Sequence, residues 1–202
     1  WTDGCIGSME GLYFESSTTT PFHFLIQSEL STTPSRAQRD LPYRSFDIDA
    51  GIDHLQQFGV KYYASSSQVA TEKAQQHRSL NEIAQSGPWT IFKVENSELV
   101  TQLDFEPAIF DQLEHSEWLN PSVIVFQEGS DAVVRTLGGL NNWQQVDPEE
   151  TPERIRLPHI EISEINVHTD RIEFKVDKTG VPVIVKTSYL PNWKTKGAEG
   201  PW

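Results

Sequence analysis

Three closely spaced strand-like segments near the C-terminus constrain the fold more than any other feature of the chain. Residues 160–167 and 171–176 alternate apolar and polar side chains, and a Thr179–Gly180 turn leads into a β-branched segment over 181–186. Alternation with a period of two is typical of strands that bury one face and expose the other. The short connection between the first two segments predicts a hairpin. The sequence therefore predicts an antiparallel, β-sandwich-like C-terminal part.

The residues before position 105 mix helical and strand patterns. Apolar residues recur at helical spacing over 48–58, between Asp47, an expected N-cap, and Gly59, an expected C-cap. A second helix is expected over 68–77, with Val69 and Ala70 or Ala74 on its inner side. Strands are expected over 60–64, 80–84 and 89–94. These elements predict a small α/β unit.

The pattern between positions 107 and 158 is mixed. We expect a strand over 107–110, a short helix over 111–118 and a short buried piece over 123–126, followed by an acidic connector. The predicted fold class is therefore α+β, a small α/β unit followed by the antiparallel part. We place the division between 1–105, which includes an aromatic-rich N-terminal loop, and 106–202, as parts that can form one compact body.

The charge and cysteine content narrow the function classes. A net charge of −13 argues against nucleic acid as a partner, because binding to phosphates needs a clustered basic face. The same charge argues against electrostatic docking on an anionic bilayer. Cys5 is the only cysteine in the sequence, so no intrachain disulfide can form. The apolar runs over 123–126 and 181–185 are too short to cross a bilayer.

The sequence contains no motif that specifies a reaction. It has no phosphate-binding glycine loop, no dinucleotide fingerprint and no zinc-binding HExxH helix. None of the six histidines pairs with another at metal-ligand spacing, and no order of Ser, His and Asp specifies a triad. We therefore predict no catalytic residue, no metal site and no cofactor for this chain.

The N-terminal loop combines aromatic and acidic residues. Trp1 and Tyr13 accompany Asp3 and Glu10, and sugar sites join an aromatic platform to carboxylate or amide acceptors. The alternative is a loop that its own aromatic side chains hold against the body of the protein. A further alternative is a hydrolase in which Asp3 and Glu10 form the carboxylate pair of a glycosidase.

Further candidates for ligand contact lie along the chain. Arg36 and Arg39, near Arg44, form a basic pair that suits a phosphate or carboxylate, although surface salt bridges are the plainer interpretation. Trp193, after Pro191, either stacks on a ligand or caps the core. The candidate ligand-binding residues are thus Trp1, Asp3, Glu10, Tyr13, His23, Arg36, Arg39 and Trp193.

Some segments have a distinctive sequence: Trp1–Tyr13, Pro21–Phe24, His54–Tyr63, Ser86–Trp89 and the terminal run Val183–Trp202, which includes Ser188–Trp193 and Gly197–Pro201. These segments resemble a family of large actinobacterial multi-pass membrane proteins. The resemblance covers both ends of the chain and the α/β unit and is thin between 107 and 158. These proteins are similar to YfhO-type and C-type membrane glycosyltransferases, which use lipid-linked sugars. Some are labelled 6-pyruvoyl-tetrahydropterin synthase-related, yet this sequence lacks the clustered zinc histidines of such a synthase.

The resemblance implies an extracytoplasmic domain that membrane helices flank in a longer parent chain. The catalytic acid of such transferases lies in a loop between early membrane helices, so the resemblance transfers no catalytic residue to this segment. We therefore expect a non-catalytic domain for cell-envelope glycan or glycolipid assembly, with a glycan or lipid-linked sugar as its partner and with no nucleic acid. The alternative is a structural or protein-interaction module that braces the membrane helices.

Overall fold

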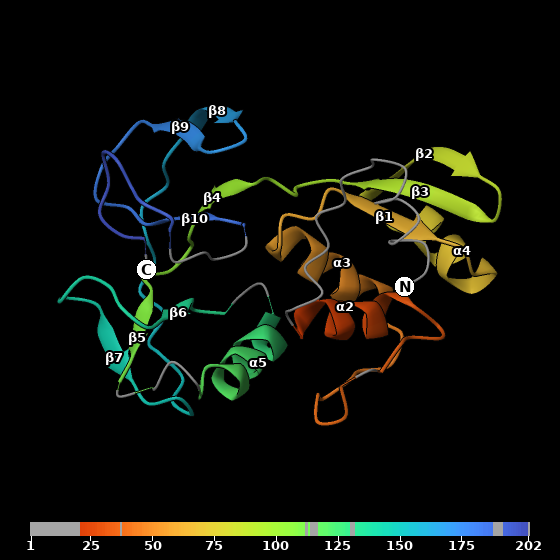
Figure 1. The fold of residues 1–202 in the computed structure, drawn as a ribbon, viewed down its shortest axis with the longest axis horizontal. Helices are drawn as coiled ribbons and strands as arrows, with labels where there is room; N and C mark the ends of the chain where they lie inside the picture. Colours follow the sequence, from red (N-terminus) through yellow and green to blue (C-terminus); the bar gives the residue numbers. More distant parts are fainter. Residues whose placement is uncertain are drawn as a thin grey trace.

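The computed structural model describes residues 21–36, 38–111, 113, 117–129, 132–187 and 192–201, and every structural statement below concerns these residues. They form an α+β fold of helices and several small sheets (Figure 1), as the sequence predicts. The C-terminal part consists mostly of antiparallel strands and contains no closed barrel within these ranges. The expected ligand residues Trp1, Asp3, Glu10 and Tyr13 lie outside the described residues.

The N-terminal elements form a three-stranded antiparallel sheet and three helices. The sheet has the order β1–β3–β2, with Tyr63 opposite Phe92. The elements are α2 (Phe22–Leu30), α3 (Ile48–Gln57), β1 (Tyr62–Ser65), α4 (Gln68–Gln76), β2 (Leu80–Ser86) and β3 (Trp89–Val94).

Helices α3 and α4 border the candidate site described below, and local caps define the ends of α3. The Ala50 N–H donates to Asp47 Oδ1 at 3.2 Å, so Asp47 caps α3 as predicted. Gly59 follows α3 with φ +68°, a left-handed conformation that favours glycine after a helix. In α4, Ala70 and Ala74 are buried as predicted, whereas the predicted inward position of Val69 is wrong, because Val69 is exposed.

The main core lies between α2, α3 and one face of the sheet. Phe92 and Ile52 are fully buried there, and the Tyr63 and Phe92 rings stack with centroids 6.0 Å apart. A Cβ added at Gly51 would lie 2.5 Å from Leu30 Cδ2, so α2 and α3 approach each other at this glycine. The other face of the sheet, which holds Tyr62 and Trp89, is exposed.

The remaining elements form three small sheets and one helix. β4 pairs with β10 and β8 with β9, both antiparallel, whereas β6 and β7 flank β5 in parallel. The elements are β4 (Val100–Gln102), β5 (Ala108–Phe110), α5 (Leu119–Glu128), β6 (Arg135–Thr136), β7 (Gln144–Val146), β8 (Ile162–Val167), β9 (Ile172–Val176) and β10 (Val183–Val185).

Two local expectations for this part, a helix over 111–118 and a strand over 181–186, differ from the structure. The piece expected to be buried over 123–126 is buried at Val123 and Phe126 and lies within helix α5. The helix expected over 111–118 is wrong for its described residues, because α5 begins only at Leu119. Part of that expected helix lies outside the described residues. The expected strand over 181–186 shortens to β10, whose three residues are half-buried. By contrast, the hairpin expected over 160–176 is confirmed as β8 and β9.

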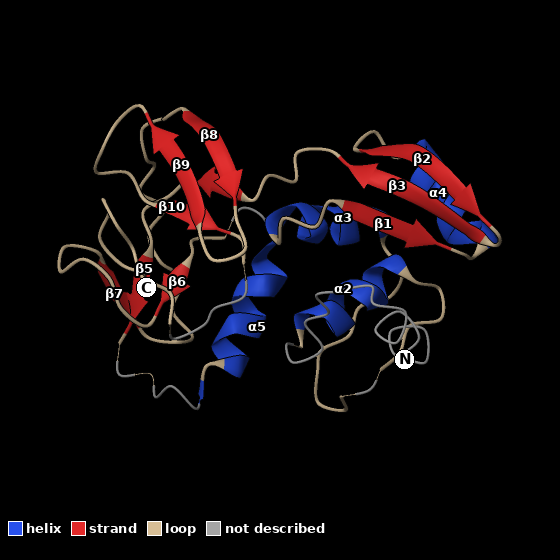
Figure 2. Ribbon diagram, turned by 45° about the horizontal axis from the view of Figure 1, so that its top comes forward, coloured by secondary structure: helices blue, strands red, loops and turns tan. Residues whose placement is uncertain are grey.

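Elements on the two sides of residue 105 pack together, and β4 pairs with β10 across this division. Val123 and Phe126 of α5 belong to the same buried cluster as α2 and α3. The Lys186 Nζ, after β10, donates to the Gln56 carbonyl at 2.8 Å. Both views place α5 between the N-terminal sheet and the C-terminal strands (Figure 2).

Candidate functional site

The sequence-predicted ligand residues that the structure describes do not form a cluster. The His23 ring packs against Phe24 with centroids 3.9 Å apart, and Arg36 lies 5.7 Å above the Tyr43 ring. Arg39 is exposed in the following turn, and Trp193 is half-buried in the C-terminal segment. His23, Arg36 and Arg39 make no hydrogen bond or ring contact with one another, so the structure does not bring these three together.

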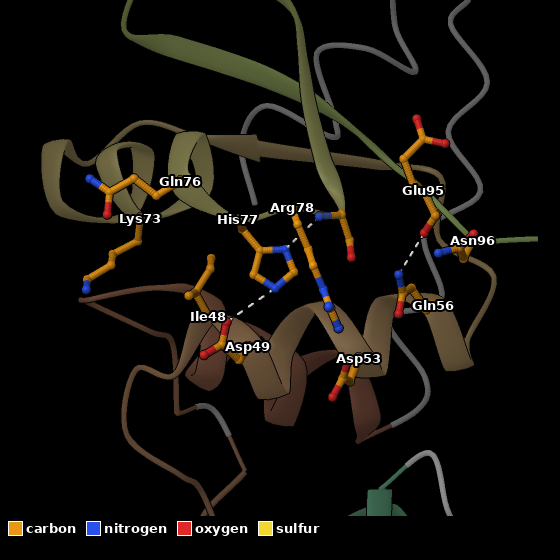
Figure 3. A pocket seen from close by; sticks show the side chains of 11 residues that line it. Ile48, Asp49, Asp53, Gln56, Lys73, Gln76, His77, Arg78, Glu95 and Asn96 are labelled. Carbon is orange, nitrogen blue, oxygen red and sulfur yellow. Dashed lines mark hydrogen bonds and ion pairs between the residues drawn. The ribbon is translucent and has the colours of Figure 1, made fainter.

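A polar cavity lies elsewhere, between α3, the end of α4 and the turn after β3. This cavity, here called the α3–α4 pocket, has a volume of about 770 Å³ (Figure 3). The residues that line it with charged, amide or imidazole groups are Asp49, Asp53, Gln56, Lys73, Gln76, His77, Arg78, Glu95 and Asn96. None of these residues is predicted as a site residue from the sequence. The pattern that indicates a polar surface here is Asp49 and Asp53, which lie four residues apart on the polar face of the helix expected over 48–58.

The His77 ring is held at both nitrogens. The Ser79 N–H donates to His77 Nδ1 at 3.2 Å, so this nitrogen is unprotonated. The proton of the neutral ring is therefore on Nε2, which lies 3.3 Å from Asp49 Oδ1 and points toward it. Neither nitrogen of His77 is free to accept a proton from a ligand, so in this arrangement the imidazole orients Asp49 rather than acting as a general base.

The Glu95–Asn96 turn forms a fixed edge of the pocket. Gln56 Nε2 donates to the Glu95 carbonyl at 2.7 Å, which ties the turn to α3. On the other side, Glu95 Oε1 accepts from Asn81 Nδ2 at 2.7 Å and from Lys93 Nζ at 3.2 Å. The Asn81 amide, and then Lys93, hold the pKa of the Glu95 carboxyl below its ordinary value. Glu95 is therefore an ionised acceptor at neutral pH.

Five charged or amide side chains of the pocket are free to meet a ligand. Among the described residues, the lining side chains of this kind without a hydrogen-bond or ion-pair partner are Asp53, Lys73, Gln76, Arg78 and Asn96. Arg78 extends across the pocket toward α3, and Lys73 lies on the other side of the His77–Asp49 pair (Figure 3). The pocket thus offers an anionic acceptor, two cationic donors and two amides, which suits a polar ligand rich in hydroxyl groups.

A smaller hollow adjoins the α3–α4 pocket. This hollow, here called the Tyr62 hollow, measures about 320 Å³, and Glu95 and Asn96 line both cavities. Its other residues include Lys61, Tyr62 and Lys93. Tyr62 is 60% exposed, so its ring is available as a flat surface beside the polar groups.

A second polar cluster is closed to solvent. Glu29 Oε2 lies 2.6 Å from His54 Nδ1, and both side chains are at most 2% exposed. His54 Nε2 lies 3.0 Å from the Phe126 carbonyl, which can only accept, so Nε2 bears a proton and donates it. A single further proton therefore lies between Glu29 and His54, and the pair is neutral overall whichever partner holds it. Arg44 Nη1 approaches Glu29 Oε1 at 3.6 Å from the surface.

Two kinds of feature are absent from the described part of the chain. No group of three or more His, Cys, Asp and Glu side chains there is arranged to hold a metal ion. No helix there combines the length and the apolar character that a membrane span requires.

The chain was compared with protein-family models, curated proteins and solved structures. The chain matches no protein-family model, no curated protein and no solved structure.

Proposed function

We propose that this chain is a non-catalytic extracytoplasmic domain that recognises a carbohydrate, as part of a membrane protein in cell-envelope glycan or glycolipid assembly. The observation behind the proposal is the α3–α4 pocket, whose free charged and amide groups are an acid, two cations and two amides. The setting rests on the sequence resemblance alone. A lipid-linked sugar would place its sugar in this pocket, beside the membrane-embedded site of the parent protein.

The polarity of the pocket supports a hydroxyl-rich ligand. Carboxylate, amide and guanidinium groups are planar, and each can form hydrogen bonds with two neighbouring hydroxyl groups of a sugar at once. Asp53 comes from α3, Arg78 from the loop after α4 and Asn96 from the turn after β3, so three separate elements converge on one ligand. The engagement of both His77 nitrogens supports recognition rather than proton transfer.

A glycan array followed by calorimetry tests the proposal. The chain should bind an envelope-type glycan on the array, and Arg78→Gln should weaken that binding about tenfold, as expected for a charge-assisted hydrogen bond. Arg39→Gln is the matched control, because Arg39 is also exposed and also makes no ion pair among the described residues. Loss of binding in Arg39→Gln but not in Arg78→Gln would place the site outside the pocket. Absence of binding to every glycan would contradict the proposal.

A structural module is the second candidate, and the β8–β9 hairpin favours it. Ile165, Val167 and Val176 of this hairpin are exposed, and the two strands form a sheet by themselves. A two-stranded sheet with exposed apolar residues is marginal alone and gains stability from a covering partner. Under this alternative, Val167→Lys would disrupt assembly of the parent protein while leaving glycan binding intact, and pull-down of the parent complex would show the loss.

A further inference from the structure

The α3–α4 pocket and the Tyr62 hollow share one wall, the Glu95–Asn96 turn. The side chain of Glu95 bonds to Asn81 and Lys93 on the sheet side, while its carbonyl bonds to Gln56 on the α3 side. The turn therefore borders both hollows and is here called the ridge. A ligand longer than the α3–α4 pocket would reach the second hollow by crossing this ridge.

We propose that the two hollows form one binding surface for an oligosaccharide, which crosses the ridge at Asn96 and stacks a sugar ring on Tyr62. This inference rests on the proposed function and extends it from a single sugar unit to a chain of units. It also assigns the pocket and the hollow separate roles. The α3–α4 pocket holds one unit by hydrogen bonds, and Tyr62 holds another by contact with its ring.

The ridge is fixed before any ligand arrives. Ser97, which is buried, donates from Oγ to the Val60 carbonyl at 2.8 Å and ties the turn to the start of β1. Gln56 holds the other side of the turn. Asn96 has φ +55°, a left-handed conformation that asparagine tolerates better than most residues, and its amide is exposed. Because the backbone of the turn is already fixed, binding of a ligand to this amide costs little conformational entropy of the turn.

Tyr62 has the position and the chemistry for stacking. Burial alternates along β1, so Tyr63 faces the core while Tyr62 faces outward, opposite Lys93 on β3. An aromatic ring presents an apolar face, and the Tyr62 hydroxyl and the two lysines that line the same hollow supply hydrogen-bonding groups. A sugar ring has the same division, with apolar C–H faces and a polar rim. Because charged groups interrupt the apolar surface here, a sugar chain fits it better than an apolar protein helix.

Calorimetry with sugars of increasing length tests the inference. The probes are mannose and α-linked oligomannosides of two to four units, with N-acetylglucosamine oligomers of the same lengths as a second series. In one series at least, affinity should rise about tenfold between one and three units and then level off. Tyr62→Ala should abolish that rise and leave the affinity for the single sugar unchanged, whereas Tyr62→Phe should retain it, because an aromatic stacking contact is worth about tenfold or more in affinity.

Trp89→Ala is the matched control. Trp89 is 46% exposed on the same face of the sheet, but it lies four residues from Lys93 along β3, a distance of about 13 Å. This variant should bind every probe as the unaltered chain does. In NMR spectra, the single sugar should shift amide signals of the α3–α4 pocket, such as those of Asp53 and Arg78, and leave Lys61 and Tyr62 unshifted. The trimer should also shift Lys61 and Tyr62.

The outcomes separate this inference from the proposed function. Binding of the single sugar with no gain on lengthening, or with NMR shifts confined to the α3–α4 pocket for every length, overturns the extended surface and keeps the proposed function. An equal loss of single-sugar and trimer affinity in Tyr62→Ala has the same meaning. Absence of binding by every member of both series overturns both.

Discussion

Removal of one partner of the buried Glu29–His54 pair should destabilise the protein far more than removal of both. In His54→Leu, the Glu29 carboxyl remains at 1% exposure, with Arg44 at 3.6 Å as its nearest charge. In Glu29→Leu, His54 Nδ1 loses its 2.6 Å partner while the ring stays stacked on Phe126, with centroids 3.8 Å apart. Each single change should lower the free energy of unfolding by about 3–5 kcal/mol, the usual cost of a broken buried pair.

The double variant should recover most of that loss. Leucine is close in volume to both side chains, and replacement of a whole buried pair by apolar residues is often neutral. The Phe126 carbonyl loses its bond from His54 but keeps the Gly129 N–H at the end of α5, so it does not become unpaired. Arg44 is 41% exposed and still donates to the Gln127 carbonyl, so it stays solvated. The double variant should therefore lie within about 1.5 kcal/mol of the unaltered chain.

Urea unfolding at pH 7, followed by circular dichroism, measures these free energies. The control is the exposed pair of Lys175 and Glu164, whose charged atoms lie 2.7 Å apart. Lys175→Met should change the free energy of unfolding by less than about 1 kcal/mol, because solvent screens an exposed pair. Single variants at Glu29 and His54 that cost under about 1 kcal/mol would refute the reasoning. A double variant whose cost equals the sum of the two single costs would also refute it.

Three further predictions concern the helices and the ridge. Gly51→Ala should destabilise the protein by about 1–3 kcal/mol in the same urea assay, because the new Cβ would lie 2.5 Å from Leu30 Cδ2; an unchanged midpoint would contradict this. Asp47→Ala should cost about 1 kcal/mol through loss of the α3 cap, whereas Asp47→Asn should cost less. The Glu95 carboxyl should titrate below its ordinary pKa in carbon NMR spectra, and Asn81→Ala should raise that pKa. Because folding lowers this pKa, the stabilisation from Glu95 is present above the unfolded pKa and is lost as the pH falls through the folded one.

The sequence predicts the elements whose signals are local. Asp47 and Gly59 bound α3 because a cap depends on a few neighbouring residues, and strands β2 and β3 follow from the patterns over 80–84 and 89–94. The predicted burial of Ala70 and Ala74 is confirmed, whereas that of Val69 is wrong, because only the packing of α4 decides which of these neighbouring residues face inward. Helix α5 was missed because a short apolar run does not distinguish a buried strand from a helix.

The candidate site was not predictable in the same way. Asp53, Arg78 and Asn96 lie on three elements whose approach depends on how α3 and α4 pack against the sheet. Each residue alone has the polarity of an ordinary surface position, so no pattern along the chain links them. Arg36 and Arg39 are close in the sequence, which is why the sequence suggests a basic pair for a ligand. In the structure, however, Arg36 packs on Tyr43 and Arg39 lies in a turn.

The position of α5 has a consequence for the order in which the chain folds during synthesis. The ribosome completes α2, α3 and the first sheet well before it reaches Phe126, whose ring stacks on His54 and whose carbonyl accepts a hydrogen bond from His54 Nε2. Until then, His54 lacks both contacts, and the cluster of α2 and α3 lacks the side chains of α5. We therefore expect a nascent chain that ends at residue 105 to be protease-sensitive around His54, and a chain that extends past α5 to gain protection in a single step.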